Sequence, residues 1–464
     1  MMKAIKTLLI FVFTVGFVGV VLPRVYAQED ACEVLSLEDF IHSASINDKR
    51  FEEILIDKLK LKYKKALGLP ADDLVISLKR QYNFVFDPKD TEEEDTISLS
   101  KLFPYTGTEI AAEYNSSFSR TTHEMTSDFE VTVSQPIAEN AFGRNSRLLG
   151  KIIGVETDVA NFQIIEAYED YLASLVQLYY NWYSACENVR TARNSYNENV
   201  KLLENIKERE KYKIALPVDV NKVSLQVAIK KEALITLQNK YDEYLNMIKE
   251  SIRYEGEEDL QPRTPSAYED VEIDFEADYA KFSAESRTIE ILKMLETKSA
   301  IEVNKYADEL LPSIDIIAGY SLEGTGREIE DVNRLVYAGA SLDWPFPGAV
   351  ERAGYETSKI ELNKTKLFAE NIHCRLHTNL KNLNDQIIRE KELIVTARNK
   401  IDYAQAIVDD DKKNYSLGRT TLNDLIDEVN KLEDNKFNKI FHEVQLKRLI
   451  VEWLRLTDTL LQKE

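Results

Sequence analysis

Two hydrophobic periodicities alternate along this chain. In short segments the apolar residues fall at every second position, which indicates strands with one apolar and one polar face. In long segments they fall at every third or fourth position, which indicates helices with an apolar stripe. The sequence has 11 prolines, and none lies within residues 137–216 or 348–464. Because proline interrupts helices, these two tracts are predicted to be long helices.

The stripes in the two proline-free tracts are typical of coiled coils. One consists of Val189, Ala192, Tyr196 and Leu203, and the other of Ile394, Ala397, Ile401, Ala404 and Val408. We predict that the first long helix runs from about Ala138 to Glu208. Its length would be about 105 Å at 1.5 Å per residue, far more than a globular domain needs.

Period-two segments precede each helical tract. In the second half they are Ile314, Ile316, Ala318, Tyr320 and Leu322, then Val336, Ala338, Ala340, Leu342 and Trp344, around a polar loop predicted at Glu323–Asn333. Each run has about the 9–11 residues that a tilted strand needs to cross a bilayer. A soluble antiparallel hairpin packed on a core would show the same periodicity, so this alternative stays open.

The first half contains four β-like stretches. Two alternate clearly, namely Ile76, Leu78, Tyr82, Phe84 and Phe86, and then Phe129, Val131 and Val133. Two weaker stretches lie between them, Ile97–Phe103 and Thr108–Phe118, separated by Pro104 and Gly107. The pattern does not decide which of the four enter the same barrel.

The two halves also share sequence. Thr191–Asn194 recurs as Thr396–Asn399, an offset of 396 − 191 = 205, and the same offset carries Asp219 onto Asp424, since 424 − 219 = 205. We therefore predict a duplication, with repeats at 28–265 and 266–464. Their β segments are expected at about 74–136 and 312–345, and their helical turns near 213–219 and 418–421.

The first 27 residues have the pattern of an export signal. Lys3 and Lys6 precede an apolar run, Leu8–Leu22, and Val25–Ala27 forms a small-residue cleavage site. The run is shorter than the roughly 20 residues of a spanning helix, which argues against an uncleaved anchor. Glu29 and Asp30 argue against lipidation of Cys32. No later window approaches 18 consecutive apolar residues, so a membrane span would have to be made by strands.

Charge and motifs exclude several function classes. With 59 basic and 80 acidic residues the formal charge is −21, and an acidic chain without a basic cluster is not expected to bind nucleic acid. There is no phosphate-binding glycine loop, nucleophile elbow or two-cysteine zinc spacing, so we expect neither an enzyme nor a cofactor.

The cysteines and histidines allow two further hypotheses. His373, Cys374 and His377 could share one helical face, but a fourth metal ligand is not evident, so we expect no metal site and leave the question open. Cys186 and Cys374 lie 186 − 136 = 50 and 374 − 345 = 29 residues from their strand ends. Along the helix axes, the two cysteines would therefore lie at distances from their strand ends that differ by about 31 Å, which is too far apart for a disulfide.

In order, spacing and duplication these features resemble the TolC family of outer-membrane efflux proteins. The resemblance is carried by Leu35–Glu38, Leu311–Ile314, Trp344–Gly348 and the turn residues Tyr415 and Gly418. It implies an α+β membrane protein, a trimeric outer-membrane β-barrel with four strands per protomer. The barrel would continue into a long periplasmic α-helical barrel closed at its tips. Four strands cannot close a barrel alone, whereas twelve can.

The chain departs from the family pattern in two places. Its first β region, at about 63 residues, is longer than the second, at about 34, so an enlarged loop or an extra hairpin is possible. At the first turn, Glu210 and Lys213 replace Tyr415 and Gly418.

The resemblance also implies roles for residues at the second turn. Asp424 and Asp427 correspond to aspartates that line the periplasmic entrance, where a trimer would place six negative charges that select cations. The alternative is that they are ordinary first-turn acids favoured by the helix dipole. Tyr415, Gly418 and Arg419, with Asp219 in the first copy, are candidate turn or latch residues.

The expected function is a passive exit duct in a tripartite efflux or type I secretion system. The expected partners are two further copies of the chain, a periplasmic adaptor, an inner-membrane transporter and outer-membrane lipid. Small molecules, metals and polypeptides all remain possible cargoes. The alternative is a periplasmic coiled-coil spacer with a small soluble β module.

Overall fold

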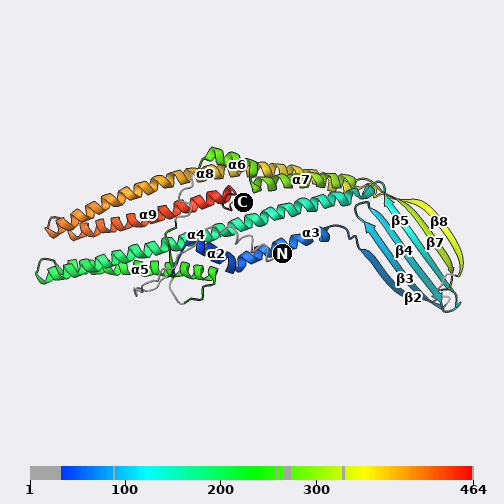
Figure 1. Cartoon of the computed structure of the whole chain (residues 1–464), viewed down its shortest axis with the longest axis horizontal. Coiled ribbons are helices and arrows are strands. Elements are labelled where there is room, and N and C mark those ends of the chain that lie inside the picture. Colours follow the sequence, from blue (N-terminus) through cyan, green and yellow to red (C-terminus); the bar gives the residue numbers. More distant parts are fainter. Residues whose placement is uncertain (1–32, 87–88, 257–259, 266–272, 327–329, 462–464) are drawn as a thin grey trace, which may run out of the picture.

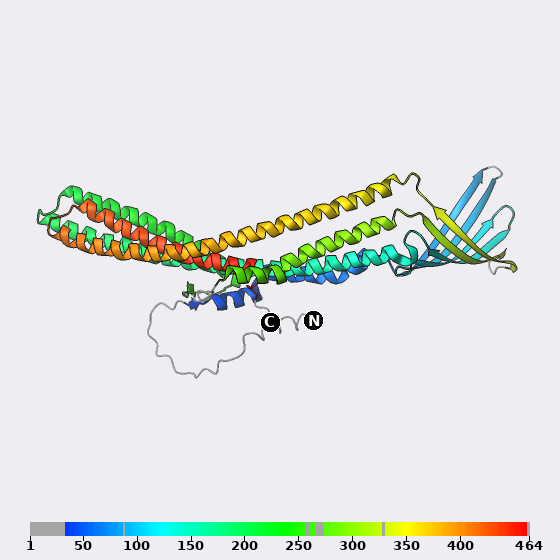
Figure 2. The same ribbon diagram turned by 90° about the horizontal axis from the view of Figure 1, so that it is seen from above.

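The molecule is long and narrow, with a β-sheet at one end and the tips of helical hairpins at the other (Figures 1 and 2). The computed structural model describes residues 33–86, 89–256, 260–265, 273–326 and 330–461. The predicted signal peptide and Cys32 lie outside the described residues.

The two halves of the chain contain a similar succession of elements, except that the first has four long strands and the short helix η2 where the second has two strands. The first half comprises β1 (Glu33–Leu35), α2 (Leu37–Asn47), α3 (Lys49–Gly68), β2 (Leu74–Phe86), β3 (Lys89–Phe103), β4 (Thr108–Ser119), β5 (Met125–Pro136), η2 (Ala141–Gly143), α4 (Arg144–Lys211) and α5 (Pro217–Ile252). The second comprises β6 (Leu260–Pro262), α6 (Phe275–Glu285), α7 (Arg287–Asp308), β7 (Ser313–Thr325), β8 (Glu330–Asp343), α8 (Ala349–Ser416) and α9 (Leu422–Leu456). Helices α4 and α8 both have 68 residues, and their first residues are 349 − 144 = 205 positions apart.

Helix α4 begins at Arg144, six residues later than the predicted start at Ala138. Asn140, Phe142 and Gly143 have positive φ angles of 52°, 50° and 74°, and this left-handed turn separates the last strand from the helix. The Asn140 side chain accepts the Asn145 amide at 2.9 Å, which satisfies an otherwise unpaired amide of the first helical turn. The spacing of apolar residues contains no sign of this turn, so the helix start predicted from the sequence was too early.

The six long strands form one antiparallel sheet in the order β2-β3-β4-β5-β7-β8. The sheet of one chain therefore has six strands, two more than the four per protomer that the resemblance implies for the barrel, because all four β-like stretches of the first half enter the sheet. The predicted polar loop at Glu323–Asn333 is also too long, since β7 extends to Thr325 and β8 starts at Glu330. Glu323 pairs directly with Asn333, so the ladder continues through polar positions.

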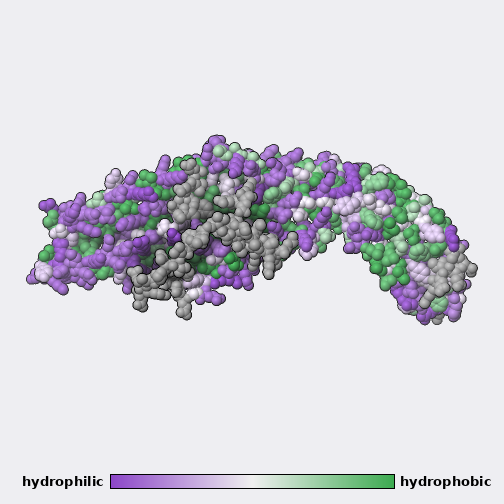
Figure 3. Space-filling model, viewed as in Figure 1, coloured by the Kyte–Doolittle hydropathy of each residue, from purple (hydrophilic) through white to green (hydrophobic). Residues whose placement is uncertain are grey.

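The sheet has one apolar and one polar face. The registers place these residues of successive strands on the apolar face: Ile76 and Leu78, Ile97 and Leu99, Ile110 and Ala112, Val131 and Val133, Ala318 and Tyr320, Val336 and Ala338. Many are open to solvent, with Ile76 at 64% and Val336 at 78% exposure. Figure 3 shows hydrophobic residues gathered over the part of the sheet next to the helices.

The described part of the chain has no hydrophobic core beneath this sheet. None of the buried apolar residues belongs to these six strands. This arrangement argues against the alternative of a soluble hairpin packed on a core.

The helices continue the sheet as a layer. Next to the sheet, α3 packs on α4, α4 on α7 and α7 on α8, while farther away α4–α5 and α8–α9 form two antiparallel hairpins. The predicted stripes face inward, with Ala192 and Val408 buried. The main core lies midway along the molecule around Tyr179, whose hydroxyl donates to Leu35 O and Arg263 O at 2.8 Å each.

Gly143 offers a test of the strand-to-helix junction. A Cβ there would lie 2.5 Å from the Tyr105 carbonyl, in a backbone conformation unfavourable for L residues. We expect Gly143→Ala to destabilise the fold by at least about 1–2 kcal/mol from the φ angle alone, and further through displacement of the β3–β4 turn.

Gly154, inside α4 with open space around its Cβ position, provides the control. Gly154→Ala should stabilise the fold by about 0.5–1 kcal/mol. The measurement is thermal unfolding of both purified variants. A Gly143→Ala midpoint equal to that of Gly154→Ala would contradict the proposed importance of this turn.

Candidate functional site

The end opposite the sheet holds the turns that the sequence singled out. Lys213 and Gly418, which are 205 positions apart, both have left-handed backbones, with φ of 58° and 72°. In the first turn the Ile214 amide donates to Arg209 O at 2.9 Å, and the corresponding amide and carbonyl 205 positions later are also 2.9 Å apart. The two turns thus share a backbone shape, although only the second has the glycine that favours it.

The two hairpin tips pack against each other. Ile206, Val223 and Leu422, from α4, α5 and α9, form a buried cluster. Tyr415 lies at its edge with the Arg209 guanidinium 4.9 Å from its ring centre, a cation–π contact between the two repeats. Burial raises the pKa of the Tyr415 hydroxyl.

Asp424 caps the start of α9. Its carboxylate accepts the Thr421 hydroxyl at 2.7 Å and the Thr421 amide at 3.3 Å, and these two bonds hold the pKa of the carboxyl below its usual value. Asp219 caps α5 in the same way by accepting the Leu216 amide at 3.2 Å. Both aspartates therefore lie in the first turn of a helix and accept an amide at its start.

Asp427 and Arg419 differ from these capping residues. Both side chains are exposed, and within the described residues neither makes a hydrogen bond or ion pair. Asp427 thus places a negative charge at the tip, one turn beyond Asp424 and one turn before Lys431, whose pKa it helps to raise.

A polar seam joins the two hairpins above their tips. The Gln226 amide donates to Asn430 at 2.6 Å, and the Ser195 hydroxyl donates to Glu433 at 2.6 Å. Lys230 pairs with the same Glu433 carboxylate, and both side chains are largely buried. The sequence analysis did not predict this seam. Its only sign in the sequence is that polar and charged residues interrupt the apolar stripes of the long helices.

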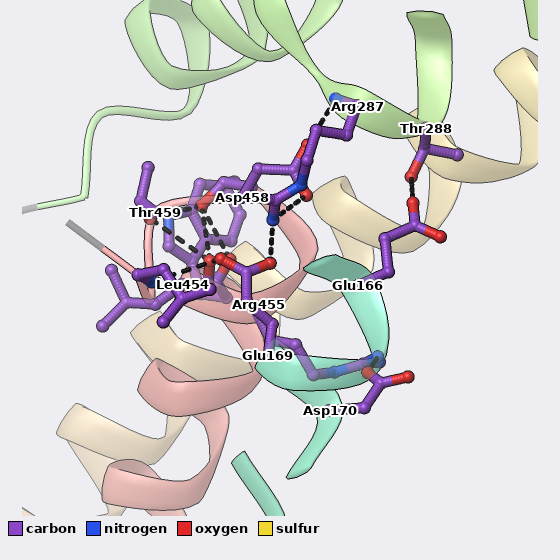
Figure 4. A network of polar contacts seen from close by, with 12 residues as sticks. Glu166, Glu169, Asp170, Arg287, Thr288, Leu454, Arg455, Asp458 and Thr459 are labelled. Carbon is purple, nitrogen blue, oxygen red and sulfur yellow. Dashed lines mark hydrogen bonds and ion pairs between the residues drawn. The ribbon is translucent and has the colours of Figure 1, made fainter. Parts of the chain in front are cut away.

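A second polar network lies midway along the molecule (Figure 4). Arg287, at the first residue of α7, pairs with Glu169 of α4 and, at 3.0 Å, with Asp458 beyond α9. These charged groups are nearly inaccessible, with side-chain exposures of 11%, 2% and 9%. The network therefore joins the two repeats at this point, midway along the molecule. Sequence reasoning missed it because the partners are more than 100 residues apart.

The other candidate residues lie away from the tips. His373 and His377 of α8 present their rings edge-on to Tyr279 of α6, at 6.5 and 4.7 Å. The described residues contain no group of side chains that could hold a metal ion. Cys186 and Cys374 are both free, and burial raises the pKa of the Cys186 thiol to about 11.

None of the described helices is long and apolar enough to span a membrane.

A scan against protein-family models and a search of curated proteins find no match. Solved structures, in contrast, resemble the chain over nearly its whole length. CusC, studied for transmembrane channel formation, is 9% identical with a TM-score of 0.71, and 91% of each chain is covered.

Two further neighbours are outer-membrane channels. OprN is 15% identical with a TM-score of 0.70, covering 91% of this chain and 89% of that one. The CmeC channel of Campylobacter jejuni is 12% identical with a TM-score of 0.69, covering 92% and 87%. The chain therefore has the fold of these outer-membrane channels. The TolC resemblance inferred from sequence is confirmed at the level of this fold.

Arg287 provides a test of the central network. We expect Arg287→Ala to cost about 3–5 kcal/mol, because it leaves the buried carboxylates of Glu169 and Asp458 without a cation, each with only a backbone amide. Lys359→Ala, which removes an exposed ion pair with Glu356, should change stability by about 0.5 kcal/mol or less. Thermal unfolding of both variants decides the matter, and similar midpoints would show that the network does not stabilise the fold.

Proposed function

We propose that the chain is a subunit of an outer-membrane channel of the TolC type, with its sheet in the membrane and its helices in the periplasm. The observation that carries this proposal is the sheet itself. It exposes a continuous apolar face with no core beneath it, and large exposed apolar surfaces mark membrane or protein contacts. Its other face is polar, as in a barrel wall that separates lipid from a water-filled lumen.

The lateral edges of the molecule support assembly into a ring. Helix α3 and strand β2 form one edge, and α8 and β8 form the other. Both edge helices expose apolar side chains at helical spacing, including Leu59 and Tyr63 on α3 and Ile360 and Leu367 on α8. A contact between one edge and the opposite edge of the next copy is heterologous, and such contacts form a ring when the rotation between copies closes. We propose three copies.

At the periplasmic end of this ring, the hairpin tips would surround the entrance. Asp424 and Asp427 of three copies would supply six carboxylates there, and Asp427 is the one with no competing structural role. Tyr415, Gly418 and Arg419, with Asp219 in the first repeat, would shape the tips and hold them closed. The Tyr415 contact with Arg209 is the part of such a latch that lies within one chain.

The duct would act passively. In this proposal an inner-membrane transporter supplies the energy and a periplasmic adaptor joins it to the tips, in an efflux or type I secretion system. The competing function is that of a periplasmic spacer. Reconstitution into planar bilayers separates the two, because a spacer forms no pores.

A pair of arginine substitutions tests the membrane placement. Ile316→Arg puts a charge on the apolar face, which should cost about 2–4 kcal/mol near the bilayer centre and reduce assembly. Ser341→Arg puts the same charge on the polar face, beside Asp315, and should be tolerated. The measurement is the yield of assembled protein in outer-membrane fractions. Equal yields would favour the soluble spacer.

Aspartate substitutions at the tip test the entrance. Asp427→Asn, alone and with Asp424→Asn, should lower cation selectivity and weaken block by multivalent cations in planar bilayers. Asp410→Asn is a matched control, because it removes the same charge from an exposed ion pair higher on α8. Unchanged selectivity and block in the double variant would leave helix capping as the role of Asp424.

A further inference from the structure

We infer that all six strands of each chain cross the membrane, with β2 of one copy pairing with β8 of the next, so that a trimer encloses eighteen strands. This inference rests on the proposed channel function and replaces the twelve strands expected from the sequence. It concerns the β2–β3 hairpin, which could instead lie outside the membrane wall.

The β2–β3 hairpin has the same two faces as the rest of the sheet. Leu78 pairs with Ile97, which pairs with Tyr114 of β4, so the apolar face continues without a step. The opposite face carries small and polar residues, among them Ser77, Lys79, Gln81, Thr96, Ser98 and Ser100. A hairpin immersed in water would have no need of an apolar face in register with that of its neighbours.

One polar group interrupts the apolar face of the hairpin. Arg80 pairs with Glu93 and Asp95 of β3, and its guanidinium lies 5.5 Å from the ring centre of Tyr82. Arg80 is the seventh of the 13 residues of β2, and Tyr82, Phe84 and Phe86 follow it on the same face toward the free end of the strand. The aromatic residues that follow it are typical of the interfacial girdle of a membrane barrel.

The sheet edges coincide with the edges of the helical layer. Strand β2 directly follows α3 and runs away from the helices, whereas β8 runs back toward them and directly precedes α8. Placed side by side in two copies, β2 and β8 are therefore antiparallel. Edge backbone groups have no water to bond within a bilayer, so the edge contact that joins the helices must also join these strands.

The widths of the two layers agree only when six strands are counted. Six strands spaced about 4.8 Å apart and tilted by about 40° extend about 38 Å around a barrel, whereas four extend about 25 Å. The four helices that continue the sheet, packed about 8–10 Å apart, extend about 32–40 Å. A six-stranded wall therefore meets the helical wall without narrowing.

The predicted consequence is a wide lumen. The same spacing and tilt give a backbone diameter of about 36 Å for eighteen strands, compared with about 24 Å for twelve. The membrane section would then not be the narrowest part of the duct, which leaves the tips to limit the size of the cargo.

Cysteine pairs can identify the strand that meets β8 of the next copy. In a full-length chain lacking its native cysteines, Ser341→Cys on β8 is combined with Val75→Cys, Ser77→Cys or Lys79→Cys on β2. The matched set combines it with Glu109→Cys, Ala111→Cys or Glu113→Cys on β4, at a similar height and on the same polar face. We expect oxidation to yield disulfide-linked trimers in the β2 set alone.

The outcomes separate the inference from the function on which it rests. Linked trimers in the β4 set, or assembled trimers that never link through β2, would overturn the eighteen-strand wall and leave the channel intact. A chain that stays monomeric and forms no pores would overturn the channel itself.

A second measurement compares Leu78→Arg with Ser77→Arg. If the hairpin crosses the membrane, Leu78→Arg should strongly reduce trimer yield in the outer membrane, while Ser77→Arg leaves it close to that of the parent. Parental yield for both variants would place the hairpin outside the bilayer and overturn the inference.

Discussion

The unpaired backbone along the two outer strands is the constraint on which this molecule depends. Every inner strand of the sheet is hydrogen-bonded to a neighbour on both sides, but β2 and β8 each have a neighbour on one side only. In water such an edge invites aggregation, and in lipid it is prohibitively costly. One chain is therefore an incomplete structure, and the same edges that leave the sheet open also expose the apolar stripes of α3 and α8.

The rigid coupling of the sheet to the helices depends on a few residues at the junction. Gly143 brings the start of α4 against the β3–β4 turn, where a larger residue would clash with the Tyr105 carbonyl. Buried Asp308, at the end of α7, accepts the Asn140 amide at 2.9 Å and faces Arg144 at 3.5 Å. The junction thus ties both repeats together, as Arg287 does farther down the helices.

Periodicity predicted the two-faced strands and the long helices because both depend on local alternation of residues. It failed where the structure depends on partners distant in sequence. The polar start of β3, from Lys89 to Thr96, shows no apolar alternation and is a strand because β2 lies beside it. The link from Arg287 to Glu169, and the Tyr415 contact with Arg209, likewise join the two repeats and leave no local signal. Asp424 was the intermediate case, since its place in the first turn of a helix was predicted from the sequence, whereas its bonds to Thr421 were not.

The β2–β3 hairpin also shows that the number of strands between α3 and α4 must be even. Helices α3 and α4 lie on the same side of the sheet, and each strand carries the chain from one side to the other. The segment between them can therefore hold two strands or four, but never three, because an odd number would deliver α4 to the opposite side. The wall of such a protein can widen only in steps of a whole hairpin, and in the proposed trimer each step would add six strands. The path of the chain therefore restricts the wall to a few discrete widths, whichever side chains line it.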